Sequence, residues 1–255
     1  MSGQVRVGTA GWQIPRAVRD AFPEAGSTLQ RYAARFAGVE INSTFYRPHR
    51  PATFERWAAD TPAAFRFAVK APRTITHEKR LADASEPLAA FLDQIASLGP
   101  KLGPLLIQLP PSLAFDAAVA ERFFAELRAR FDGEVACEPR HRTWFEAAAE
   151  ALLVGTKVAR VAADPACVAE AAMPGGWTGF SYWRLHGSPR MYWSAYGAAR
   201  ITALAGAVAA PAWVVFDNTA SGAATEDALA LTQTMCGGDP TSSPAAASPA
   251  SSPAP

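Results

Sequence analysis

The strongest constraint on the fold is a regular alternation of strand-like and helix-like segments along almost the whole chain. Eight short runs rich in β-branched and aromatic residues are the candidate strands: 5–10, 38–42, 65–70, 103–109, 133–139, 157–163, 180–187 and 212–218. Amphipathic segments rich in Ala and Leu follow them, at 27–37, 51–60, 85–98, 116–131, 143–153, 165–172, 197–208 and 221–235. Eight strand–helix units over about 235 residues match a (β/α)8 barrel, which typically has ~250 residues.

The main alternative to the barrel is an open, doubly wound parallel sheet. Such a sheet more often has a glycine-rich phosphate turn of the form GxGxxG after its first strand. The corresponding stretch in this chain, "GTAGW" at 8–12, lacks that spacing. The sequence therefore predicts a single-domain α/β fold of the (β/α)8 TIM-barrel class, and no nucleotide cofactor is expected.

The barrel is predicted to span residues 1–236. The remainder, 237–255, is almost wholly Gly, Pro, Ala and Ser and is predicted to be a disordered tail.

A net charge of +1, from 24 basic and 23 acidic residues, gives no overall attraction to nucleic acid or to a membrane, so binding of nucleic acid would need a local basic patch. Neither a signal peptide nor an apolar span of ~18 residues is evident, which predicts a cytoplasmic protein. Three cysteines without metal-binding spacing predict reduced thiols.

Polar residues occur at the carboxyl ends of seven of the eight predicted strands, or just after them, where a barrel has its functional mouth. These residues are Glu40, Asn42, Lys70, Gln108, Glu138, Arg140, Asp164, Arg184, His186, Asp217 and Asn218. Because side chains alternate along a strand, Glu138 and Arg140 share one face, and Arg184 and His186 share another, each pointing toward the barrel axis. Structural ion pairing is the alternative for any single residue. For the whole set a functional site is favoured, because desolvating several charges together is costly.

Several motifs of the chain resemble the DUF72 family, also called YecE-like proteins. The motifs occur in the expected order between Val5 and about Met235: "VGTAGW", "VEINSTFY", "FRFAVK", "ITHEKRL", "KLGPLLIQLPPS", "CEPRHRTWF", "YWRLHGSP" and "VVFDNTASGAA". The resemblance implies a TIM barrel, and the family brings no established biochemical activity. It implies these motif positions: Glu40, Asn42, Phe45, Tyr46, Lys70, Thr76, His77, Gln108, Glu138, Arg140, His141, Trp144, Arg184, His186, Gly187 and Asn218. At Asp217 the family more commonly has Asn.

The leading hypothesis is a hydrolase-type enzyme that acts on a phosphate-bearing or other anionic substrate, a phosphodiester included. Glu40 and Glu138 would act as an acid/base pair, and His186 is the third catalytic candidate. A cationic cluster would grip the anion, with arginine able to bind it bidentately. The candidate substrate-binding residues are Asn42, Tyr46, Lys70, His77, Gln108, Arg140, His141, Trp144, Arg184 and Asn218.

Two further hypotheses stay open. A divalent metal is the only cofactor considered, and its candidate ligands are Glu138, His141, Asp164, His186 and Asp217. No HxH or HExxH spacing supports such a site. The functional alternative is a non-catalytic binding protein for a small anionic ligand, because a single sequence does not separate a binding pocket from a catalytic one.

Overall fold

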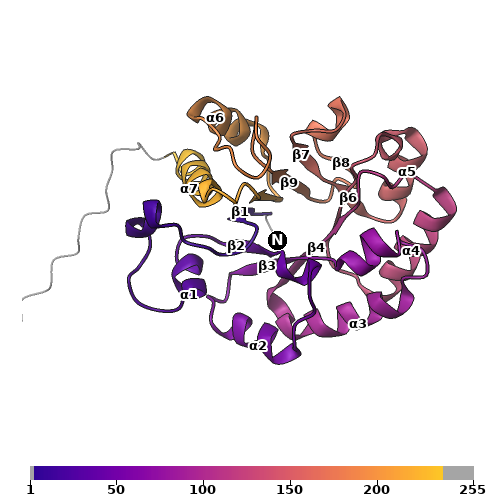
Figure 1. Cartoon of the computed structure of the whole chain (residues 1–255), viewed down its shortest axis with the longest axis horizontal. Helices are drawn as coiled ribbons and strands as arrows, with labels where there is room; N and C mark the ends of the chain where they lie inside the picture. The colour runs from indigo at the N-terminus through magenta and orange to yellow at the C-terminus, as the bar shows by residue number, and fades with distance from the viewer. Residues whose placement is uncertain (1–2, 238–255) are drawn as a thin grey trace, which may run out of the picture.

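The computed structural model describes residues 3–237, with strands at the centre and helices in a ring around them (Figure 1). The strands are β1 (Val5–Thr9), β2 (Gly38–Ile41), β3 (Arg66–Lys70), β4 (Leu102–Gln108), β5 (Val135–Glu138), β6 (Val158–Arg160), β7 (Ala162–Asp164), β8 (Gly175–Gly176), β9 (Ser181–Leu185) and β10 (Ala212–Phe216). The α-helices are α1 (Thr28–Ala33), α2 (Pro51–Ala59), α3 (Ser85–Ile95), α4 (Ala117–Arg130), α5 (Ala147–Gly155), α6 (Ala198–Ala207) and α7 (Ala223–Met235). Apart from Gly237, the predicted tail lies outside the described residues.

The strands form two hydrogen-bonded sheets, in the orders β1-β10-β9-β7 and β2-β3-β4-β5-β6-β8. Every pair is parallel except β6 with β8. The sheets meet at two places. Ala10 forms a single bridge with Glu40, and β6 and β7 are consecutive halves of one predicted strand, with Val161 between them. β6 pairs with β5, and β7 pairs with β9. The strands therefore follow one another around a ring in the order of the predicted α/β barrel.

The sixth helix of the barrel is the main difference from the prediction. Residues 165–172 contain only a short 3-10 turn, Ala169–Ala172, and the two-residue strand β8 follows it. Ala171 is the sole buried residue of that turn, so the segment has no apolar stripe to hold a longer helix against the sheet. In Figure 1 the sector between α5 and α6 accordingly holds β7, β8 and short turns.

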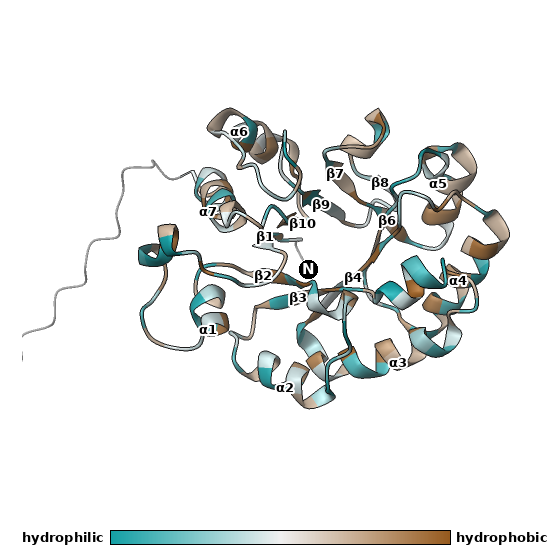
Figure 2. Cartoon of the chain, in the orientation of Figure 1, coloured by the Kyte–Doolittle hydropathy of each residue, from teal (hydrophilic) through white to brown (hydrophobic). Residues whose placement is uncertain are grey.

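Helix α4 shows how the local sequence builds the outer ring. The Asp116 side chain accepts a hydrogen bond from the backbone N–H of Val119 and so caps the first turn. Its buried residues, Ala120, Phe123, Phe124 and Leu127, recur at the spacing of one helix face. Figure 2 shows the same mixture of hydrophobic and hydrophilic positions along the helices of the ring. No helix within residues 3–237 is both long and apolar enough to cross a membrane.

The apolar residues form two cores on opposite sides of the strands. The larger core lies between the strands and the helices and includes Val69, Cys137, Leu185 and Phe216. The smaller core, called the barrel interior below, consists of Ala68, Leu106, Ala136, Ala159, Val161, Phe180, Tyr182, Trp213 and Val215. Alternate residues of one strand divide between the two, as Ala136 and Cys137 do on β5. The predicted inward and outward faces are thus observed.

Trp213 closes the amino-terminal end of the barrel interior. Its ring stacks on Tyr182, with centroids 6.3 Å apart and planes 8° apart. A Cβ atom at Gly38 or at Gly103 would come within 2.8 Å of the Trp213 ring, so neighbouring strands carry glycine where they pass the indole. The filled base leaves the carboxyl ends of the strands as the end at which a ligand has access to the interior.

Replacing Trp213 with Ala should remove this closure and destabilise the fold by about 3–5 kcal/mol, because the surrounding strands relax only partly around the cavity. Urea unfolding measures the change. Trp193→Ala is the matched control, since Trp193 is 46% exposed and its removal should change stability by less than about 1 kcal/mol. Equal losses in the two variants would contradict the role given to Trp213.

Candidate functional site

The carboxyl ends of the strands bring seven polar side chains into one buried layer above the barrel interior. This charged layer consists of Glu40, Lys70, Gln108, Glu138, Arg184, His186 and Asp217. Each of the seven is at most 5% exposed. Their charges are therefore largely removed from water, so each one needs a compensating partner.

Arg184 is the centre of the charged layer. Its Nη2 lies 2.8 Å from Glu40 Oε1 and 2.9 Å from Asp217 Oδ2, and its Nη1 lies 2.7 Å from Glu138 Oε2. Its Nε donates to Glu40 Oε2 at 3.1 Å, which makes the contact with Glu40 bidentate. Burial lowers the pKa of Arg184, but the three carboxylates outweigh burial and hold the pKa well above its usual value. The guanidinium is therefore charged in the folded protein.

These contacts change two roles that the sequence predicted. Arg184 was expected to bind an anionic ligand, but four of its N–H positions already face carboxylates, and a ligand would have to displace an internal partner. Glu40 was expected to be an acid or a base. Both of its oxygens accept hydrogen bonds from Arg184, and Oε2 also accepts one from Tyr182 at 2.9 Å. Glu40 therefore positions Arg184.

His186 bridges two carboxylates of the charged layer. Its Nε2 lies 3.0 Å from Glu138 Oε1, and its Nδ1 lies 3.2 Å from Asp217 Oδ2. Burial lowers the pKa of His186, but the charge of Glu138 and the hydrogen bonds to both acids outweigh burial and raise the pKa above its usual value. Both ring nitrogens face acceptors, which is the arrangement of a protonated imidazolium.

Glu138 and Asp217 are held in their ionised forms. Burial would raise the pKa of Glu138, but Arg184 and His186 hold it well below its usual value. Gln108 adds a hydrogen bond from its Nε2 to Glu138 Oε2 at 3.0 Å. The same two cations outweigh burial at Asp217 and lower its pKa as well. Among Glu138, His186 and Asp217, the proton therefore resides on the His186 ring.

Tyr182 was not among the predicted site residues. It precedes Arg184 by two residues on β9, and its hydroxyl binds Glu40, so it joins the barrel interior to the charged layer. The alternation that places Arg184 and His186 on one face also places Tyr182 there. That signal was present in "YWRLH", but an aromatic residue in a strand more commonly indicates packing alone.

Lys70 differs from the other charged members of the layer because no carboxylate pairs with it. In the part of the chain that the structure describes, its Nζ has no hydrogen-bond or ion-pair partner, and it lies 4.2 Å from the centre of the Phe45 ring. Burial lowers the pKa of Lys70 from 10.5 to about 8, and the charge of Arg184 is the second cause of this decrease. The carboxylates of Glu40, Asp217 and Glu138 oppose this change without cancelling it.

A cavity of about 200 Å³ opens beside the charged layer. Glu138 and His186 line it from the inside, and Arg140 and Met191 line it from the rim. The Arg140 guanidinium lies 3.9 Å from the sulfur of Met191 and pairs with no carboxylate within residues 3–237. A cation without an internal partner therefore stands at the edge of a cavity whose inner wall holds a protonated histidine.

His77 marks a second cationic edge of the same mouth. Its Nδ1 lies 2.8 Å from the hydroxyl of Thr76, and its ring meets the Phe45 ring edge-on. Burial lowers the pKa of His77, and the charges of Lys70 and Arg140 lower it further. Lys70 ends β3 and Arg140 follows the end of β5 in the same sheet, so both cations lie at this mouth.

The two asparagines predicted to bind substrate have different surroundings. Asn218 is fully buried and donates from Nδ2 to Ser194 O and to Asp227 Oδ2, so it anchors the segment that follows β9. Asn42 lies just after β2 and lines a separate cavity of about 560 Å³, together with Trp12. Asn218 therefore supports the mouth, whereas Asn42 faces a neighbouring wall.

Three other predicted contacts lie outside the charged layer. Trp144 is buried against Phe115, and its Nε1 donates to Leu113 O at 3.0 Å, so it supports a loop and does not face the cavity. The His141 side chain accepts from Thr143 N and caps a short 3-10 turn. Tyr46 is 70% exposed on the rim. Of these three, Tyr46 alone is freely available to a ligand.

The five candidate metal ligands do not form one group. Asp164 pairs with Arg200 at 2.8 Å, and His141 is used in the cap described above. Glu138, His186 and Asp217 do meet, but Arg184 and the imidazolium occupy the positions between their oxygens. In residues 3–237 no cluster of three or more His, Cys, Asp or Glu side chains is arranged to hold a metal ion. The guanidinium supplies the positive charge that a divalent cation would bring to these carboxylates.

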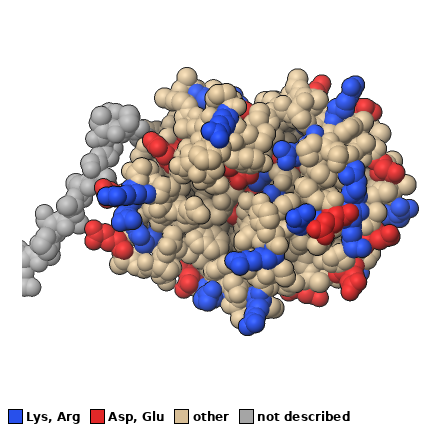
Figure 3. All heavy atoms as spheres, in the orientation of Figure 1, with Lys and Arg blue, Asp and Glu red and all other residues tan. Residues whose placement is uncertain are grey.

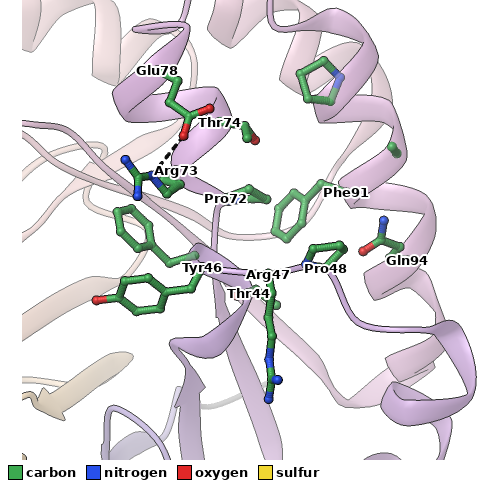
Figure 4. Close-up of a pocket in the computed structure, with 13 residues that line it drawn as sticks. Thr44, Tyr46, Arg47, Pro48, Pro72, Arg73, Thr74, Glu78, Phe91 and Gln94 are labelled. Carbon is green, nitrogen blue, oxygen red and sulfur yellow. Dashed lines mark ion pairs between the residues drawn. The ribbon is translucent and has the colours of Figure 1, made fainter.

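A larger cavity, of about 430 Å³, lies between the turn after β2 and helix α3 (Figure 4). Its wall is mainly apolar, with Pro48, Pro72 and Phe91, and an Arg73–Glu78 ion pair at 3.0 Å lies at its edge. No member of the charged layer lines this cavity.

The face of the molecule in Figure 3 carries acidic and basic side chains interspersed around its periphery, without a broad area of one sign.

A parallel α/β barrel with a charged layer at the carboxyl ends of its strands is the class of protein that these observations define. The family model described as "Protein of unknown function DUF72" matches residues 6–251. The chain therefore belongs to the DUF72 family, as its motifs predicted.

Relatives and solved structures agree with this assignment. The UPF0759 protein YecE of Escherichia coli K12 is 33% identical over 106 residues, covering 42% of this chain and 38% of that protein. The UPF0759 protein YunF of Bacillus subtilis is 28% identical over 149 residues, covering 55% and 52%. The matches thus span about half the length, or less, of these curated relatives.

Two crystal structures of DUF72 family proteins share the fold. The protein from Enterococcus faecalis has a TM-score of 0.77 and 21% identity, over 91% of this chain and 96% of its own. The protein from Thermotoga maritima has a TM-score of 0.73 and 26% identity, over 91% and 98%. The α/β barrel arrangement is therefore that of the family.

Replacing Arg184 with Met should destabilise the fold by about 3–5 kcal/mol near neutral pH, because Glu138 and Asp217 lose their central cation. Without that cation burial raises the pKa of both acids, so protonation favours the folded variant and the deficit should shrink as the pH is lowered toward about 5. Urea unfolding at both pH values measures this. Arg190→Met, at an exposed arginine, is the control. A deficit that is independent of pH would contradict the prediction.

The low pKa of Lys70 should appear in the pH dependence of stability. Between pH 8 and 10.5 the unfolded chain binds more protons at this residue than the folded chain does. The stability of the wild type should therefore rise across this window, by up to about 3 kcal/mol. Lys70→Met lacks the group and should lack this part of the rise. Guanidinium unfolding at several pH values compares the two, and parallel curves would show that Lys70 titrates normally.

Proposed function

We propose that this protein is an enzyme that binds a small anionic ligand, bearing a phosphate or a carboxylate, at the carboxyl-terminal mouth of the barrel and transfers a proton to it. The observation that carries the proposal is the surplus of positive charge beside the 200 Å³ cavity. Glu40, Glu138 and Asp217 are balanced by Arg184 and the imidazolium of His186 together with Lys70, which leaves Arg140 uncompensated. An anion in this cavity would supply the missing charge.

The His186–Glu138 pair is the proposed proton donor. The imidazolium Nε2 lies 3.0 Å from Glu138 Oε1, and both side chains line the cavity. A leaving oxygen of a bound ester or phosphoester would take up the proton of this pair while Arg140 holds the negatively charged oxygens. Hydrolysis of an anionic ester is therefore the proposed reaction class, with a phosphodiester as one member of the substrate class.

A non-catalytic binding protein is the second candidate. Its support is that Glu40 and Glu138, the two carboxylates expected to act as acid and base, are both saturated by internal partners. A carboxylate whose oxygens already accept hydrogen bonds from internal donors is poorly placed to exchange a proton with a ligand. The cationic edge alone would then account for the site, and the ligand would be bound without reaction.

The cellular compartment is part of the same proposal. All three cysteines are free thiols, with Cys137 buried and Cys167 and Cys236 exposed. Exposed free thiols are typical of proteins in a reducing compartment. These thiols support our proposal that the activity is cytoplasmic.

Inorganic phosphate should stabilise the wild type against heat. At about 100 times the dissociation constant the gain is ~2.7 kcal/mol, or roughly 5–10 °C for a chain of this size. Arg140→Gln should lose most of the shift, because it removes the uncompensated cation. Arg142→Gln, at an exposed arginine two residues away, should keep it. Identical shifts in the two variants would count against an anion site at Arg140.

Turnover separates the enzyme from the binder. We expect the wild type to hydrolyse p-nitrophenyl phosphate or its bis-ester, and His186→Gln to lower kcat at least ~100-fold while the phosphate shift persists. His49→Gln is the control, because His49 binds Ser43 on another wall. No hydrolysis above background by a wild type that phosphate stabilises would favour the binding protein.

A further inference from the structure

Lys70 is a buried amine without a polar partner, placed where barrel enzymes bind their substrates. It ends β3, its side chain is 5% exposed, and Phe45 covers one side of the ammonium group at 4.2 Å. A lysine that served the fold alone would be exposed or paired, because an unpaired buried ammonium is costly. Its surroundings therefore lower the pKa of the ammonium group and raise the fraction of neutral amine.

The carboxylates close to Lys70 are already committed to other cations. Glu40 and Asp217 bind Arg184, and Glu138 binds both Arg184 and His186. Arg184 itself opposes a second positive charge nearby. A desolvated lysine beside another cation is the arrangement that activates lysine as a nucleophile. With a pKa of about 8, roughly one-tenth of Lys70 is neutral at neutral pH.

Resting on the anion site proposed above, we propose that Lys70 forms an imine with the carbonyl carbon of a small ligand whose carboxylate or phosphate is held by Arg140. Lys70 ends β3, Arg140 follows the end of β5, and only β4 lies between these strands, so both side chains start from the same end of the sheet. The substrate class is an anionic aldehyde or keto acid.

The chemistry balances without an external oxidant or reductant. The lone pair of the neutral Nζ forms a bond to the carbonyl carbon, and the carbonyl π electrons move to oxygen, which takes up a proton. The carbinolamine nitrogen then loses a proton, and the hydroxyl group takes up another proton and leaves as water. Amine, carbonyl compound and one proton thus give a protonated imine and water. The His186–Glu138 pair lies in the same charged layer and is the local proton source.

The chain offers internal controls, because it has only four lysines. Lys79 and Lys157 are exposed to solvent. Lys101 is half-buried, but its Nζ donates to Ala58 O and to the hydroxyl and carbonyl oxygens of Thr61. Lys70 alone among the four is both buried and without a hydrogen bond in residues 3–237.

Borohydride trapping tests the proposal on the full chain. Protein is incubated with glyoxylate near neutral pH, reduced with sodium borohydride, and analysed by intact mass and peptide mapping. We expect one adduct per chain, located on Lys70, which inorganic phosphate suppresses. Lys79→Arg should label like the wild type. Lys70→Arg and Lys70→Met should not label, and their thermal midpoints establish that they are folded. Acetaldehyde, which lacks the anionic group, should label Lys70 at least about tenfold less, the equivalent of ~1.4 kcal/mol.

Two results would overturn the proposal. Adducts on Lys79, Lys157 and the α-amine with Lys70 unmodified would show that Lys70 does not form imines. Equal labelling of Lys70 by acetaldehyde and glyoxylate would reject the anionic substrate class. If phosphate still raises the thermal midpoint, the proposed anion site stands; the imine fails in the first case, and its anionic substrate class fails in the second. Absence of the phosphate shift would instead overturn the anion site itself.

Discussion

The ion pairs of Arg184 with three carboxylates are the interaction on which the rest of the structure depends. Glu40 comes from β2, Glu138 from β5 and Asp217 from the end of β10, so one guanidinium from β9 joins distant parts of the ring. The backbone ladder between β1 and β2 is a single bridge, and side-chain contacts through the centre connect the two sheets where the ladder is sparse. Because buried ion pairs return little net stability, we interpret this group as fixing an arrangement more than strengthening the fold.

The cations of the charged layer differ in their partners. Arg184 is paired with internal carboxylates, and His186 holds a proton between two ionised acids. Lys70 has no hydrogen-bond or ion-pair partner in residues 3–237. The carboxylates bind Arg184 and His186, and within residues 3–237 none of them pairs with Lys70 or Arg140. Arg140 lines the cavity of about 200 Å³, which is where a ligand would complete the charge balance.

The surroundings of the layer are built to keep it in place. From below, Tyr182 stacks on Trp213 and binds Glu40, which couples the filled base of the barrel to the guanidinium network. From above, the segment after β9 is anchored by Asn218 and Asp227, which bind Ser194 O and the backbone N–H of Tyr196. A site supported on both sides is preorganised, so a ligand would not need to order it.

The sequence by itself determined the order of the strands and the face on which each polar residue lies. That information is local, because alternation along a strand assigns Glu138 inward and Cys137 outward, and Arg184 inward and Leu185 outward, without knowledge of any partner. The count of eight strand–helix units predicted the barrel, and the family motifs agreed with it. The helix predicted at 165–172 is only a short 3-10 turn, Ala169–Ala172, and its single buried residue becomes apparent only when the sheet is present.

Only the tertiary structure decided which charges pair. Arg184 and Glu40 are 144 positions apart, and nothing local indicates that they bind each other bidentately, or that Arg184 is therefore unavailable to a ligand. The same holds for Trp144, which the motif placed at the mouth and the structure buries beneath a loop, and for Asp164, which Arg200 removes from the candidate metal ligands. Charge pairing depends on distances of a few ångströms across the ring, and those distances are set by closure of the barrel, not by the order of residues along the chain.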